Sequence, residues 1–93
     1  MFVGIVRIEL HIPGSSSLKD KRSVVQGLKE RIRQRVHAAV AEVDHQDLWQ
    51  RAALGVAVVS GQQHQVGELL QSVRNLVNAT HGAELLDWQE ERA

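Results

Sequence analysis

The residues best suited to chemistry lie in one basic stretch, "SLKDKRSVVQGLKERIRQR" (17–35), which holds seven Lys and Arg in nineteen positions. At 100° per residue, a helix would place four of these cations within about 80° of one another. Such a row can neutralise the closely spaced phosphates of RNA and release their counterions. We therefore expect RNA or phosphate contact through the row and the neighbouring Lys21, that is, at Lys19, Lys21, Arg22, Lys29 and Arg33.

The same row is also typical of a solvated helix flank, whose arginines lie over a sheet edge or pair with acidic strands. Both interpretations place the cations on one side of a helix. They differ in whether the charges have partners within the chain.

The start of this stretch, "PGSSSLKDKR" (13–22), places small residues before a helix N-terminus, as phosphate-binding loops do. It lacks the second glycine and the Gly-Lys-Ser/Thr ending of a Walker loop. We expect its serines to form a turn and a helix cap instead.

A second cluster of reactive side chains, Glu42, Asp44, His45 and Asp47, lies in "EVDHQDLWQR" (42–51). Carboxylates and an imidazole can hold a divalent metal, but the stretch supplies no further His at a fixed spacing. A simpler interpretation is that Asp44 and Asp47 cap a short helical turn and that Trp49 closes the end of the core. We predict no metal site, and whether these residues bind anything stays open.

No nucleophile, base and orienting group can be assembled from the sequence. We therefore expect a protein that is not an enzyme, with no cofactor and no small-molecule substrate. Acylphosphatases share the size and the fold inferred below, but their Gly-rich phosphate cradle with an Arg is not reproduced by "IPGSSSLKD" (12–20).

Length and composition predict one domain spanning residues 1–93, with 43% apolar and 24% charged residues. The absence of Cys excludes disulfides and thiolate metal sites and fits a reducing cytoplasm. No signal peptide or membrane span is expected, so we predict a cytoplasmic protein. The net charge of zero hides an asymmetry: residues 1–35 hold eight Lys and Arg against three Asp and Glu, and residues 36–93 hold three against eight. A local basic patch is therefore compatible with the neutral total.

Hydrophobic periodicity predicts the elements that must position these residues. Residues 2–12, 37–45, 52–60 and 83–91 are predicted as strands, and the even-numbered members of the first strand face the core. Ser17 with Asp20 predicts a helix from Leu18, and Ser60 with Gln63 a second capped helix that closes at "NATHG", with Gly82 just beyond it. The order βαββαβ indicates an α+β, ferredoxin-like split βαβ sandwich, with a four-stranded antiparallel sheet and two helices on one face.

Two stretches, "SLKDKR" (17–22) and "EVDHQDLWQRA" (42–52), are similar to the YlxP-like family of small bacterial proteins, a domain of unknown function. The resemblance covers nearly the whole chain and implies a ferredoxin-like fold. Genes of that family often lie beside genes for translation initiation and ribosome maturation factors. The resemblance therefore implies association with RNA or the ribosome, and it supplies no catalytic residues.

The sheet face opposite the helices should be open and partly apolar. It is predicted to carry the odd-numbered residues of the two central strands, Val3, Ile5, Arg7, Ala53, Gly55, Ala57 and Val59. RNA-recognition motifs stack bases on this face through aromatic side chains, and here the third strand has none. We expect a second copy of the chain or another protein to cover it.

Two functions therefore remain. The first is a non-catalytic factor that binds rRNA or a ribosomal subunit through the basic helix. The alternative is a module, most simply a dimer, that binds a copy or a partner through the open sheet face and has no role with nucleic acid.

Overall fold

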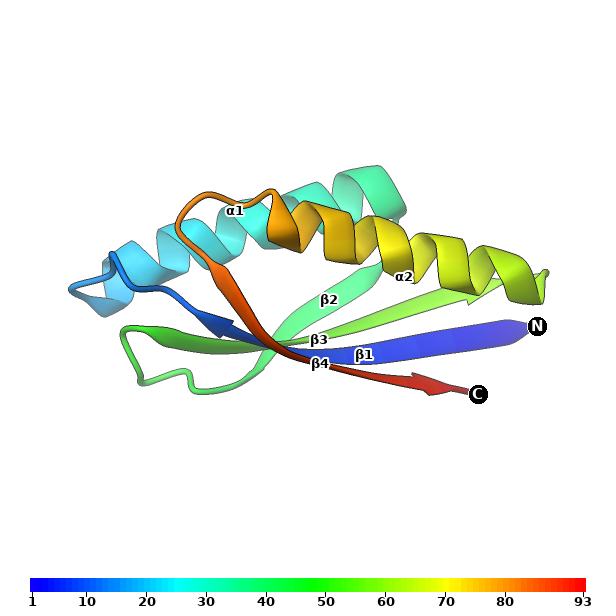
Figure 1. Cartoon of the computed structure of the whole chain (residues 1–93), viewed down its shortest axis with the longest axis horizontal. Helices are drawn as coiled ribbons and strands as arrows, with labels where there is room; N and C mark the ends of the chain where they lie inside the picture. Colours follow the sequence, from blue (N-terminus) through cyan, green and yellow to red (C-terminus); the bar gives the residue numbers. More distant parts are fainter.

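The computed structural model describes residues 1–93, which form two helices on one face of a four-stranded antiparallel sheet (Figure 1). The strand order is β2-β3-β1-β4, so β1 and β3 are central and β2 and β4 form the edges. This confirms the predicted ferredoxin-like βαββαβ fold. The elements are β1 (Phe2–His11), α1 (Leu18–Val36), β2 (Ala39–Asp44), β3 (Arg51–Ser60), α2 (Gln63–Asn78) and β4 (Glu84–Arg92).

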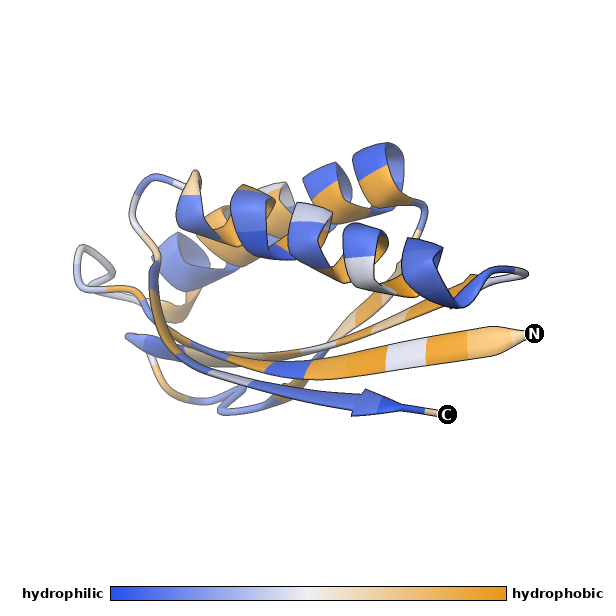
Figure 2. Ribbon diagram, turned by 45° about the vertical axis from the view of Figure 1, so that its right-hand side comes forward, coloured by the Kyte–Doolittle hydropathy of each residue, from blue (hydrophilic) through white to orange (hydrophobic).

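The core lies between the helices and the inner face of the sheet. Every second residue of β1 and β3 points into it, including Ile8, Leu10 and Leu54, although Phe2 at the start of β1 stays partly exposed. Both helices turn their apolar sides toward the sheet and their polar sides outward (Figure 2). Neither helix combines the length and the apolar character needed to cross a lipid bilayer.

Helix α1 begins as predicted. The Ser17 hydroxyl accepts a hydrogen bond from the Asp20 N–H at 3.1 Å, and the Asp20 carboxylate accepts one from the Ser16 N–H at 3.1 Å. The helix continues to Val36 and closes at His37 in the left-handed conformation, with φ of 59°. For this reason β2 starts at Ala39, two residues later than predicted.

The predicted ends of α2 are wrong in detail. Its N-cap is Gln62, which makes no capping hydrogen bond through its side chain. Ser60 instead accepts the Gln62 N–H at 3.1 Å and donates to the Gln65 side chain. Helix α2 ends at Asn78, so Gly82, with φ of 87°, lies in the following turn rather than just beyond the last helical residue.

The segment after β2 is also different from the prediction. Residues 45–50 form turns without a helix, and Trp49 is 55% exposed instead of closing the core. The Gln50 side chain donates to Ser15 O at 3.1 Å, so this loop lies beside the β1–α1 loop. The core is filled by aliphatic residues, and Trp49 is not part of it.

Helix α2 packs closely against Gly4 of β1. A Cβ at this position would lie 2.5 Å from Val66 Cγ1 and 2.9 Å from Leu70 Cδ1. Only a residue without a side chain lets α2 pack this near the centre of the sheet.

We predict that Gly4→Ala lowers the free energy of unfolding by about 1–3 kcal/mol, because α2 must move away from β1. Urea denaturation would measure the loss. The matched control is Gly67→Ala within α2, where a Cβ meets only the Arg92 side chain at 3.8 Å. This control should be neutral or stabilising by up to about 1 kcal/mol. Equal effects of the two substitutions would contradict the close approach at Gly4.

Candidate nucleic-acid interface and open sheet face

Four cations form a straight row along α1, which we call the basic row: Lys19, Arg22, Lys29 and Arg33. They fall on one face of the helix and span about 21 Å along its axis. Lys19, Arg22 and Lys29 make no ion pair and no side-chain hydrogen bond within the chain. Arg33 is engaged, because it binds Glu30 at 2.9 Å and Val40 O at 3.3 Å.

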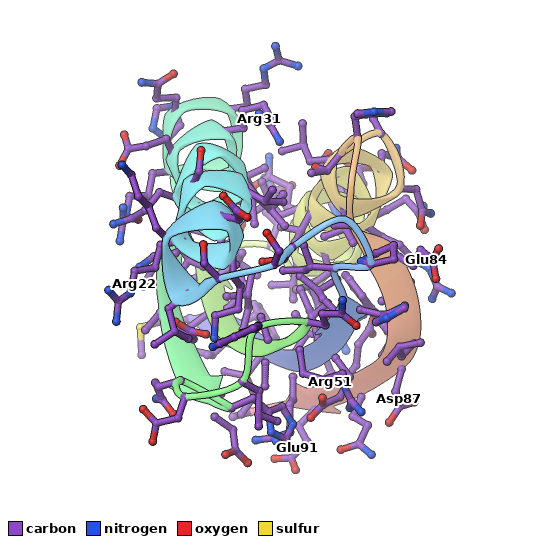
Figure 3. The ribbon with its side chains drawn as sticks, turned by 90° about the vertical axis from the view of Figure 1, so that its left-hand side faces the viewer. Arg22, Arg31, Arg51, Glu84, Asp87 and Glu91 are labelled. Carbon is purple, nitrogen blue, oxygen red and sulfur yellow. The ribbon has the colours of Figure 1, made fainter.

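The basic row lies on the side of α1 that faces away from α2. Arg31 marks the opposite side, because its guanidinium donates to Thr80 Oγ1, just after α2, at 3.0 Å. The bond from Arg33 to Val40 O shows that the row borders β2, an edge strand. Figure 3 shows Arg22 pointing outward on this margin. A large flat partner can therefore reach the row without meeting α2.

Lys21 does not belong to this surface, which corrects its place among the predicted RNA contacts. Its side chain is 0% exposed. Its ammonium donates to His45 O at 2.8 Å, Gln46 O at 3.1 Å and Glu42 Oε2 at 3.1 Å. All three hydrogens of the ammonium are therefore used within the chain.

These bonds join the two stretches that carry the family resemblance. Lys21 lies in the first turns of α1, Glu42 lies on β2, and His45 opens the loop after β2. The carbonyls of His45 and Gln46 are exposed by the turn there, in which His45 has φ of 63°. Lys21 thus fixes the N-terminal half of α1 to the end of β2.

The predicted acidic cluster is divided between the two faces of the sheet. Glu42 points to the helix side and binds Lys21, whereas His45 Nε2 lies 3.0 Å from Glu9 Oε2 on the open side. Asp44 pairs with Arg7, and Asp47 is exposed in the loop. No group of three potential metal ligands converges.

A network of charges that the sequence did not predict centres on Glu9, at one end of the open face. Arg7 Nη2 and Arg51 Nη2 donate to its carboxylate at 2.8 and 3.0 Å, beside His45. Partial burial raises the pKa of Glu9, but the bonds from Arg51 and Arg7 outweigh it and hold the pKa below its usual value. The same carboxylate raises the pKa of Arg7.

Arg7 also reaches Asp44 at 3.1 Å, and this pair must cross β3 because its members lie on β1 and β2. It passes over Ala53, which is paired in the sheet with both Glu9 and Asp44. Ala53 is consequently buried, and its predicted place on the open surface is wrong. The other predicted face residues remain at least partly accessible.

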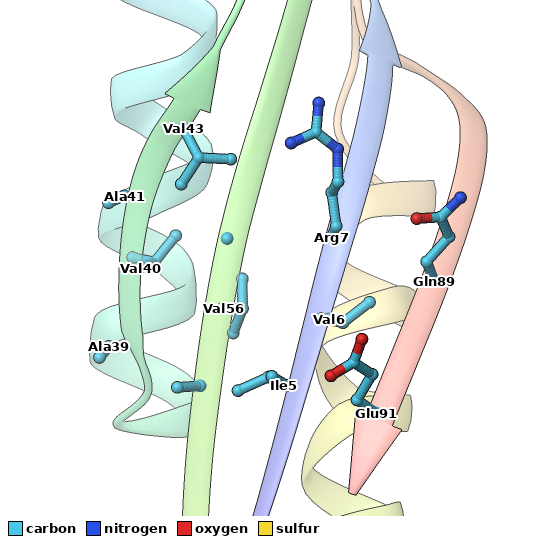
Figure 4. Close-up of a pocket in the computed structure, with 12 residues that line it drawn as sticks. Ile5, Val6, Arg7, Ala39, Val40, Ala41, Val43, Val56, Gln89 and Glu91 are labelled. Carbon is cyan, nitrogen blue, oxygen red and sulfur yellow. The ribbon is translucent and has the colours of Figure 1, made fainter.

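The rest of the open face forms a hollow of about 520 Å³ across the sheet (Figure 4). Its floor on β2 and β3 consists of small residues, because the strand pairing sets Ala39 beside Ala57 and Ala41 beside Gly55. On β1 and β4 the hollow is lined by the larger side chains of Ile5, Arg7, Gln89 and Glu91. Val43, displaced by a bulge in β2, leans over Gly55, whose Cβ would lie 2.9 Å from Val43 Cγ1.

The molecule is electrically asymmetric across its width. Cations line the α1 side, whereas β4 at the opposite edge carries Glu84, Asp87, Glu90 and Glu91 against a single Arg92 (Figure 3). The opposite charges of the two halves of the sequence are thus separated in space.

The family model described as "Protein of unknown function (DUF503)" matches residues 3–90, nearly the whole chain. The chain belongs to this DUF503 family. The uncharacterized protein YlxP of Bacillus subtilis is 31% identical over 77 residues, which is 83% of this chain and 84% of that protein. Among solved structures, a de novo designed protein with ferredoxin fold has a TM-score of 0.57 at 9% identity and covers all of this chain and 84% of its own. That likeness concerns the fold alone.

Two features of this DUF503 protein were not predicted, although the periodicity of its sequence indicates them. Alternation along β1 places Arg7 and Glu9 on one face, and pairing with β3 brings Arg51 next to them. Lys21 lies within the helical stripe of Val25, Leu28 and Ile32, so its burial follows from the 100° step. Its acceptors, two backbone carbonyls in a turn, leave no trace in the sequence.

We predict that Lys21→Met lowers the free energy of unfolding by about 2–4 kcal/mol, because it leaves Glu42 and two carbonyls without their donor. Chemical denaturation would measure the change. Lys29→Met removes a lysine of the same helix that has no partner, and it should change stability by at most about 0.5 kcal/mol. Similar values for the two variants would argue against a structural role for the buried ammonium.

A second prediction concerns how the stability of the fold depends on pH. Because its pKa is lowered in the folded state, folded Glu9 binds fewer protons than unfolded Glu9 at acidic pH. Its contribution to the free energy of unfolding is therefore fully present above the usual glutamate pKa. The contribution is lost as the pH falls through the lower folded-state value. Urea titrations of the wild type and Glu9→Gln from neutral pH to about pH 3 should therefore show a stability difference that shrinks on acidification. A difference that grows toward low pH would contradict this sign.

Proposed function

We propose that this DUF503 protein is a non-catalytic RNA-binding factor that docks on ribosomal RNA through the basic row of α1. One observation carries the proposal: Lys19, Arg22 and Lys29 are aligned on the free margin of the molecule and have no anionic partner in the chain. A cationic flank that served only to solvate the helix would more often be paired with acidic neighbours.

The geometry of the row suits a phosphate backbone. Its length of about 21 Å matches several successive phosphates, and each contact releases bound counterions. Arg22 can donate two parallel hydrogen bonds to one phosphate, whereas a lysine offers a single ammonium on a flexible side chain.

The positions of the aromatic residues indicate how RNA would be recognised. Trp88 lies on the helix side of the sheet under Arg74, with the guanidinium carbon 5.2 Å from the ring centroid. The hollow of the open face is lined by no aromatic side chain that could stack a base. Binding would therefore read the shape and charge of folded RNA rather than its sequence.

The charged groups of the open face support a non-catalytic role. Glu9 is held by Arg7 and Arg51, and the low pKa of this carboxylate suits an ion-pair partner better than a general base near neutral pH. The proposed function therefore depends on binding alone.

The test measures how strongly salt weakens binding to purified ribosomal subunits and to a duplex RNA. The double variant Arg22→Gln with Lys29→Gln removes two unpaired cations that have no structural bond. We expect weaker binding and a slope of log K against log salt reduced by about two, one for each lost phosphate contact.

The matched control removes two charges elsewhere, Arg35→Gln with Arg92→Gln, and should leave the slope nearly unchanged, since the exposed pair of Arg92 with Glu90 contributes little to stability. An unaltered slope in the row variant, or an equal reduction in both variants, would refute docking through the basic row. Circular dichroism should show that both proteins are folded.

A further inference from the structure

The open sheet face leaves large apolar side chains in water on the two central strands and on β2. Ile5 is 38% exposed, Val43 47% and Val59 60%. Ile5 and Val43 line the hollow, whose floor on β2 and β3 consists of small residues, and Val59 lies beyond it. In this small fold, helices cover only one of the two sheet faces (Figure 1).

We propose that a second copy of this chain covers the open face, so that two sheets pack against each other in a twofold symmetric dimer. The proposal uses a surface separate from the basic row and does not depend on RNA binding.

The size of the face fits this occupant. Four strands spaced about 4.8 Å apart and about eight residues long give a projected area of roughly 500 Å². Two such faces would together bury roughly 1,000 Å², the lower limit for a specific interface. A small ligand in the hollow would leave Val59 uncovered.

The shape of the face fits a second sheet. Packed sheets lie about 10 Å apart with interdigitated side chains. Ala57 and its small neighbours on β2 and β3 leave room for the partner's Ile5, while each copy's own Ile5 enters the partner's hollow. This mutual exchange of large and small residues is what a twofold interface requires.

Charge decides between the two ways of stacking such sheets. A twofold axis perpendicular to the strands would lay β4 on the partner's β4 and bring Glu91 and its acidic neighbours close to their own copies. An axis parallel to the strands lays β4 over the partner's β2, so that Glu91 faces Ala39 and Gln89 faces Ala41. In this arrangement the acidic edge of each copy lies on the same side of the dimer as the α1 cations of the other. The charges therefore point to β4 over β2.

The first experiment is light scattering coupled to size exclusion at micromolar concentrations. The wild type should have twice the mass of one chain. Ile5→Asp and the more exposed Val59→Asp should each weaken the dimer by at least about tenfold. Gln34→Asp, on the exposed side of α1, is the control and should stay dimeric.

A monomeric wild type would overturn the proposal, and so would a dimer unaffected by both face variants. Loss of the dimer in folded Val59→Asp supports it even if Ile5→Asp does not fold. Because these substitutions lie far from the basic row, RNA binding by single copies should persist, and the two proposals can fail separately.

The second experiment tests the orientation and uses the absence of native Cys. Ala39→Cys and Glu91→Cys in one chain should give a covalent dimer with a short bifunctional thiol reagent, because facing backbones of packed sheets lie about 10 Å apart, too far for a direct disulfide. The same short reagent cannot link the two Cys within one copy, because they point the same way from edge strands about 14 Å apart. Equal cross-linking by Glu91→Cys alone would place β4 on β4 and refute the orientation.

Discussion

The burial of one ammonium group determines how α1 lies on the sheet. Lys21 is enclosed on the inner side of the helix and satisfied by Glu42 and by the carbonyls of His45 and Gln46. Because a buried charge is tolerated only when its hydrogen bonds are made, this contact favours the observed rotation of α1 and its position along β2. The basic row points outward as a consequence of that rotation. Through His45 the same contact also reaches the open face, where its imidazole lies beside Glu9.

The open face is shaped by an ion pair that needs small residues beneath it. The contact between Arg7 and Asp44 passes over β3, which offers Ala53 and Gly55 at this level. Larger side chains there would separate the pair and displace Val43. The small residues Ala53 and Gly55 of β3 therefore permit both the apolar hollow and the charged network.

The fold could be predicted because the period of two in β1 and β3 and the helical period in α2 are strong local signals. The start of α1 followed from the reach of the Ser17 hydroxyl to the Asp20 N–H. The candidate site was harder to predict than the fold, because charge alone does not distinguish a buried lysine from a solvated one. Lys21 and Arg22 are neighbours in sequence, yet one points into the core and the other into solvent. The position of Trp49 depended on a turn whose backbone geometry no periodicity encodes, and for that reason its predicted burial was wrong.

The two free edges of the sheet differ in a way that bears on aggregation. Strand β2 has only six residues and a bulge, and β4 carries four acidic side chains. Short, irregular or highly charged edges resist the addition of strands from other molecules, because pairing would be interrupted or would bring like charges together. Extension of this sheet into an open-ended fibre is therefore disfavoured at both ends. The proposed association through the face, in contrast, is self-limiting, because each copy covers the open face of the other.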